Sequence, residues 1–142
     1  MLLAFFRSKQ VKWLPRSKFS LNCSKIGGRT VRFSIDVIGQ ALVATMDGDL
    51  DLHTCPQFKE ALTEALAKNT QVKHLVLDVR NLSFIDSSGL GVILGRYRDV
   101  QARGGKLIFV KANPHIKRVL RLSGMHRIAD FVDSPTEALE RA

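Results

Sequence analysis

The 142-residue sequence has few of the residues that would point to a metal site, a disulfide framework or a membrane span. Its two cysteines, Cys23 and Cys55, form no CxxC pair and have no histidine at ligand spacing, which argues against structural zinc and disulfides. No apolar run approaches the roughly 18 residues of a transmembrane helix. The four histidines are scattered, without an HExxH pattern. These absences favour a soluble globular protein with two free thiols in a reducing compartment and no bound metal.

Acidic residues are missing from the first part of the chain. Residues 1–32 contain eight Lys or Arg and no Asp or Glu, and so supply eight of the nine net positive charges. The other 110 residues are close to neutral, with 14 basic and 13 acidic side chains. The basic charge therefore belongs to a tail, and we expect no direct binding of nucleic acid by the folded part.

Residues 1–30 show no helical or strand periodicity, and we predict that they form an extension to a domain at 31–142. A secretory signal is disfavoured because the charges follow the short apolar run MLLAFF instead of preceding it. The composition is typical of an organellar transit segment or of a disordered arm attracted to anionic surfaces. A third alternative is a mis-assigned start, with translation beginning near Val31.

The rest of the chain predicts five strands and four helices in the order β-β-α-β-α-β-α-β-α. The strands are expected at 33–37, 41–48, 74–79, 106–110 and 127–132, and the helices at 55–68, 87–103, 114–123 and 135–142. This alternation is typical of a single α/β domain with a mixed, mostly parallel sheet covered by helices. In the first helix, residues at 58, 61, 62, 65 and 66 form one apolar stripe. Thr54 is placed to cap that helix, and Ser134 to cap the last one.

The stretch NLSFIDSSGLGVILGRY, residues 81–97, allows four interpretations. As structure alone, Asp86 or Ser87 caps the helix that follows. A nucleophilic serine is disfavoured because the G-x-S-x-G elbow is missing. A dinucleotide loop is disfavoured because the third glycine of G-x-G-x-x-G is displaced to Gly95, and no Walker lysine follows.

The fourth interpretation is a phosphorylation switch. A hydroxyl at a helix N-terminus is a suitable acceptor, since a phosphate there would meet free main-chain amides. The phosphate would add about −1.5 to −2 charge beside Asp86, and near Asp49 and Asp51 if their loop lies alongside. Such a change could end the docking of a partner.

Two glycines interrupt the same helix. Gly91 and Gly95 are four residues apart and lie on one helix face. Each costs roughly 1 kcal/mol relative to alanine, so close packing inside the domain or a partner surface must compensate.

The segment LDVRNLSFIDSSGLGVILGRYRDVQARGGKLIFVKANPHIKRVLRLSGM resembles the STAS domain of bacterial anti-sigma factor antagonists, the sporulation-type anti-anti-sigma factors. The DGDLD loop fits the same pattern, and the resemblance extends from about Val31 to Ala142. The basic tail departs from it, because such proteins usually begin just before the first strand. This departure favours the mis-assigned start near Val31.

The resemblance implies a non-enzymatic cytoplasmic protein that binds an anti-sigma factor and thereby releases a sigma factor. The anti-sigma factor is also a serine kinase, which would use ATP to phosphorylate this chain at Ser88 and end the binding, and a serine phosphatase would restore it. The chain itself would need no cofactor, and we expect a monomer. The partner surface would comprise Asp49, Asp51, Asp86, Ser87, Gly89, Leu90, Gly91, Gly95 and Arg96. An alternative is a STAS scaffold subunit of a transporter or stress-signalling complex without sigma control.

Overall fold

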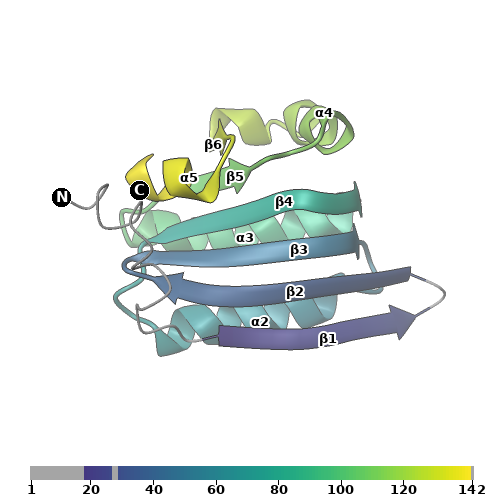
Figure 1. Ribbon diagram of the computed structural model, residues 1–142, viewed down its shortest axis with the longest axis horizontal. Coiled ribbons are helices and arrows are strands. Elements are labelled where there is room, and N and C mark those ends of the chain that lie inside the picture. The colour runs from purple at the N-terminus through teal and green to yellow at the C-terminus, as the bar shows by residue number, and fades with distance from the viewer. Residues whose placement is uncertain (1–17, 27–28, 142) are drawn as a thin grey trace.

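The computed structural model describes residues 18–26 and 29–141, which form one six-stranded sheet in the order β1-β2-β3-β4-β5-β6 (Figure 1). The strands are β1 Lys18–Ile26, β2 Arg29–Ile38, β3 Ala41–Leu50, β4 His74–Ile85, β5 Leu107–Val110 and β6 Ala129–Val132. β1, β2 and β3 pair antiparallel, while β3 to β6 pair parallel. The five predicted strands and the mixed, mostly parallel α/β sheet are confirmed.

One strand was not predicted from the sequence. β1 lies in the segment assigned to an irregular extension, and it pairs with β2 from Lys18↔Asp36 to Ile26↔Arg29. Its sequence, KFSLNCSKI, alternates apolar Phe19, Leu21 and Cys23 with polar residues, a short strand pattern that the basic composition of the segment obscured. Residues 1–17 lie outside the described part of the chain. Because Val31 lies within β2, translation from Val31 would omit β1, and the start site stays a prediction.

The helices cover the two faces of the sheet unequally (Figure 1). They are α2 Cys55–Lys68, α3 Ser87–Ala102, α4 Pro114–Leu122 and α5 Pro135–Arg141, with a short 3-10 helix, η2, at Met125–Arg127. Apolar residues of α2, α3 and α4 belong to the larger core cluster on one face. On the other face α5 packs through Ala138 and Leu139 over β5 and the strands beside it.

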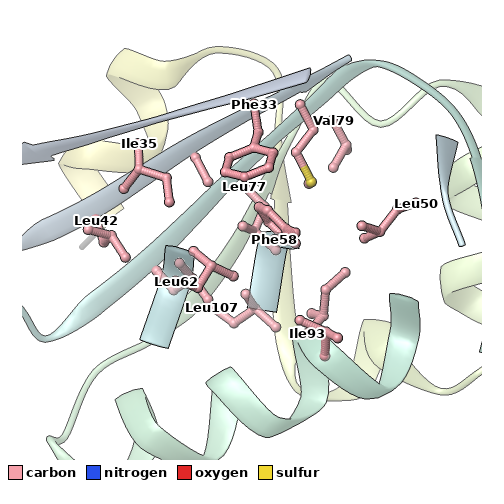
Figure 2. Packing of buried hydrophobic residues seen from close by; sticks show 14 of the residues in the cluster. Phe33, Ile35, Leu42, Leu50, Phe58, Leu62, Leu77, Val79, Ile93 and Leu107 are labelled. Carbon is pink, nitrogen blue, oxygen red and sulfur yellow. The ribbon is translucent and has the colours of Figure 1, made fainter. Parts of the chain in front are cut away.

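The larger core explains why α2 lies where it does. All five residues of its predicted apolar stripe are buried. Phe58 is fully buried and meets the ring of Phe33 of β2 edge-on, with 5.3 Å between the ring centroids (Figure 2). Burying one such side chain contributes about 1.5–3 kcal/mol. The stripe thus fixes α2 against the sheet with its N-terminus beside the end of β3.

The predicted caps are only partly as expected. The Ser134 hydroxyl accepts a hydrogen bond from Glu137 N at 3.1 Å, as predicted for α5. Thr54 occupies the N-cap position of α2, but its side chain makes no hydrogen bond to that helix. The hydroxyl instead donates to the carbonyl of Asp49, near the end of β3, at 2.7 Å.

Candidate functional site

Asp86 organises the start of α3. It follows β4 directly, in extended backbone conformation, and its Oδ1 accepts hydrogen bonds from Ser88 N at 2.9 Å and Gly89 N at 3.1 Å. Two of the amides that a helix start leaves without partners are thereby satisfied. Of the two candidates for the cap, the structure selects Asp86.

The second oxygen of Asp86 reaches a different part of the chain. Oδ2 accepts a hydrogen bond from Leu52 N at 3.2 Å, and Asp86 N donates to the carbonyl of Leu50 at 3.2 Å. The loop after β3 is therefore fastened to the N-terminus of α3. The GDLD loop thus lies beside the DSSG motif, which was the condition for a phosphate on the motif to come near Asp49 and Asp51.

Within that loop Asp51 and Thr54 form a compact hydrogen-bonded turn. Asp51 is only 4% exposed, and its Oδ1 accepts from His53 N at 2.9 Å and Thr54 N at 3.1 Å. The Thr54 hydroxyl accepts from Asp51 N at 2.9 Å and donates to the carbonyl of Asp49 at 2.7 Å. Asp51 thus shapes the surface from inside the loop, while Leu52 and His53 are exposed at its tip.

The serines and glycines of the motif have different environments. Ser87 is exposed and Ser88 half-buried. Gly89 is buried, and a Cβ there would lie 2.9 Å from both Ile85 Cγ1 and the carbonyl oxygen of Leu50. Only glycine lets the first turn of α3 approach the end of β3 so closely. Leu90 is half-buried and packs against the core.

Gly91 and Gly95 open a groove between α2 and α3. A Cβ built at either glycine meets nothing within 4 Å, so internal packing does not explain them. The groove has a volume of about 430 Å³. Its lining residues are Cys55, Pro56, Lys59, Ser88, Gly91, Val92, Gly95 and Arg96.

The groove is positively charged and has Ser88 at one end. Of the described residues that line it, the charged ones are Lys59 and Arg96. The Arg96 side chain lies between the two helices, donating to Asp99 Oδ2 of α3 at 2.9 Å and to Thr63 Oγ1 of α2 at 2.9 Å. This bridge gives the groove a fixed width on the side away from Ser88.

A second arginine ties the far ends of the helices together and was not singled out from the sequence. The Arg103 guanidinium donates to the carbonyls of Leu66 at 2.8 Å, Val72 at 2.9 Å and Asn69 at 3.2 Å. These carbonyls belong to the end of α2 and the loop after it, where acceptors lack helical partners. Basic residues after a helix are common, so no sequence signal distinguished Arg103.

Cys55 lies under the groove as a protonated thiol. Burial raises the pKa of Cys55, and the carboxylates of Asp86 and Asp51 raise it further. A thiol with a raised pKa is a weak nucleophile near neutral pH. The described residues include no cluster of three His, Cys, Asp or Glu side chains suited to a metal. None of the helices in the described ranges is long and apolar enough to cross a membrane.

Comparisons with known proteins identify relatives of this chain. A family profile described as the STAS domain matches residues 32–138. An anti-sigma F factor antagonist of Paenibacillus polymyxa is 40% identical over 98 residues, which cover 69% of this chain and 83% of the relative.

Two solved structures share the fold. One is the anti-sigma factor antagonist SpoIIAA in its unphosphorylated form, at 28% identity and a TM-score of 0.63, covering 77% of this chain and 96% of that one. The other is the Bacillus cell fate determinant SpoIIAA in the phosphorylated form, at 29% identity and a TM-score of 0.62, covering 77% and 97%.

Proposed function

The chain belongs to the STAS domain family, and from this premise we propose that it is an anti-sigma factor antagonist switched by phosphorylation of Ser88. In its unmodified form it binds an anti-sigma factor and so releases a sigma factor. The anti-sigma factor acts as the serine kinase and supplies ATP, and a phosphatase reverses the modification. The chain acts in the cytoplasm as a non-enzymatic binding protein.

The observation that carries the proposal is the position of Ser88. It lies at the N-terminus of α3 and at one end of an open groove whose glycine floor none of the described residues fills. A partner segment that packs on Gly91 and Gly95 would bring its own surface close to the Ser88 hydroxyl. The same contact would serve both capture and phosphoryl transfer.

Phosphorylation at this position would end binding without unfolding the domain. The phosphate would carry about −1.5 to −2 charge at the positive end of the α3 dipole, next to the Asp86 carboxylate that already holds the amides of Ser88 and Gly89. If the bound partner has an acidic group about 4 Å from the phosphate, the repulsion between the two is roughly 4 kcal/mol per charge pair at a surface-like dielectric. That energy corresponds to a loss of about three orders of magnitude in affinity.

The test uses the anti-sigma factor candidate encoded in the same genome, with binding followed by calorimetry with and without ATP. Wild-type protein should bind without ATP, become phosphorylated with ATP, and dissociate. Ser88→Ala should bind in both conditions and resist phosphorylation, while the neighbouring control Ser87→Ala should behave like wild type. Dissociation of the Ser88→Ala complex by ATP would show that Ser88 is not the switch.

A further inference from the structure

A second positively charged surface lies on α4, outside the groove. Residues 111–127 contain five of the fourteen Lys and Arg that follow residue 32 and none of the thirteen Asp and Glu. The remainder of the domain therefore has an excess of acidic residues. The near-neutral net charge of the domain conceals a strong separation of charge.

The basic residues of α4 surround an apolar depression. Ile116 and Leu120 are fully buried and fix the inner side of the helix on the core. On the outer side, a shallow depression of about 420 Å³ is lined by Pro114, Lys117, Arg118, Arg121 and Leu122, which we call the α4 patch. Leu122 is 80% exposed, more than any other large apolar residue whose side chain the structure describes.

The cations of the α4 patch have no acidic partner within the described residues. The ion pairs found among the described residues lie elsewhere and join Glu64 to Lys68, Asp78 to Arg80, Asp99 to Arg96 and Glu137 to Arg141. The ammonium of Lys117 lies 5.8 Å from the ring centroid of Phe131. A cation–π contact positions the ammonium but does not neutralise its charge.

The α4 patch is held near the carboxyl end of β4, the strand that leads to Ser88. Asn113 Oδ1 accepts from Ile116 N at 2.9 Å and caps α4, while its Nδ2 donates to the carbonyl of Leu82 in β4 at 2.8 Å. β4 continues from Leu82 to Ile85 and then to the Ser88 turn. Figure 1 shows α4 at the end of the sheet to which the arrowhead of β4 points.

We propose that the α4 patch is a second contact for the anti-sigma factor, receiving an acidic segment of that partner together with one apolar side chain. Unpaired cations around an apolar floor match such a segment in both charge and hydrophobicity. A membrane fits less well, because Ile116 and Leu120 are buried and, within the described part of α4, Leu122 is the one large apolar residue that is exposed. A nucleic acid would pair with the cations but would leave Leu122 without an apolar side chain to cover it.

The inference rests on the proposed function and predicts a mainly kinetic effect, because charges at the rim of an interface steer association. The test measures binding of the purified anti-sigma factor by stopped flow at several salt concentrations. The variant combines Lys117→Glu, Arg118→Glu and Arg121→Glu. Its control combines Lys68→Glu, Lys73→Glu and Lys106→Glu, which change the net charge equally at exposed positions outside the patch.

At low salt the α4 variant should associate about tenfold more slowly than the control, and the difference should shrink at high salt. Leu122→Ser should increase the dissociation rate several-fold, since it removes the apolar contact. Circular dichroism shows whether each variant is folded. Equal association rates for the α4 variant and its control would overturn the inference while leaving the proposed function intact.

Failure of the wild-type protein to bind the anti-sigma factor would overturn the proposed function, and the inference with it. Two further probes are a short DNA duplex and phosphatidylglycerol vesicles. If wild type binds either one through the α4 patch while the triple variant keeps its normal rate with the anti-sigma factor, the protein-partner assignment is wrong.

Discussion

Replacing glycine by alanine should have opposite effects on stability at different positions of α3. Gly95→Ala adds a methyl group that meets nothing within 4 Å, so the gain in helix propensity, about 1 kcal/mol, should appear almost fully as stability. The Gly91→Ala and Gly95→Ala double variant should gain roughly 2 kcal/mol, because both sites are open. For a domain of this size that corresponds to an increase in Tm of very roughly 8 °C.

Gly89→Ala should have the opposite effect. Its Cβ would lie 2.9 Å from the carbonyl oxygen of Leu50, a main-chain atom that cannot move without displacing the end of β3. Overpacking of this kind typically costs about 1–3 kcal/mol, which exceeds the gain in propensity. Urea unfolding followed by far-UV circular dichroism measures both effects.

Binding provides the second measurement on the same variants. The added methyl groups at positions 91 and 95 project into the groove, so the more stable double variant should bind the anti-sigma factor about tenfold or more weakly. Arg98→Ala, at an exposed position of α3 outside the groove lining, is the control and should bind normally. The reasoning is refuted if the double variant is less stable than wild type, or if it is more stable and binds with unchanged affinity.

The remaining predictions concern the Asp86 cap and the thiol beneath the groove. Asp86→Ala should lower the free energy of unfolding by about 1–2 kcal/mol or more, because it removes the cap of α3 and the acceptor of Leu52 N. The control Asp99→Ala should change the free energy of unfolding by less than about 1 kcal/mol, and equal effects of the two variants in urea titrations would contradict the role of Asp86. In a Cys23→Ser background, the rate of alkylation of Cys55 by iodoacetamide should rise with pH, and the midpoint of that rise should lie above the ordinary thiol value of 9.0. A midpoint at or below that value would contradict the raised pKa. Because the unfolded chain loses this thiol proton first, the contribution of Cys55 to stability should be complete below about pH 9 and decline as the pH rises further.

Much of the fold could be predicted because its signals are local in sequence. The stripe of α2 depends on helical spacing, and the acidic cap of α3 depends on the residue type just before the helix. β1 was missed, because the alternation of Phe19, Leu21 and Cys23 is short and lies in a basic segment, and the strand becomes evident only from its pairing with β2. The direction of the Thr54 hydroxyl also depended on neighbours that only the folded loop supplies.

For the candidate site, the sequence identified the motif but not the contacts that give it shape. The Leu52–Asp86 hydrogen bond joins residues 34 positions apart, and it exists because β3 and β4 end side by side. The three carbonyls bound by Arg103 come together only when α2 and α3 pack. Likewise, spacing placed Gly91 and Gly95 on one face, but only the neighbouring elements determine that this face is open.

The divided carboxylate of Asp86 affects how fast a partner can dock. One oxygen holds two amides of α3 and the other holds the loop at Leu52, so the two sides of the Ser88 turn are already ordered before any encounter. A surface prepared in this way loses little conformational entropy on binding, which leaves more of the contact energy for affinity. Under the proposed function, the ordered Ser88 turn would also meet the kinase in one geometry, so productive encounters would not wait for the loop to rearrange.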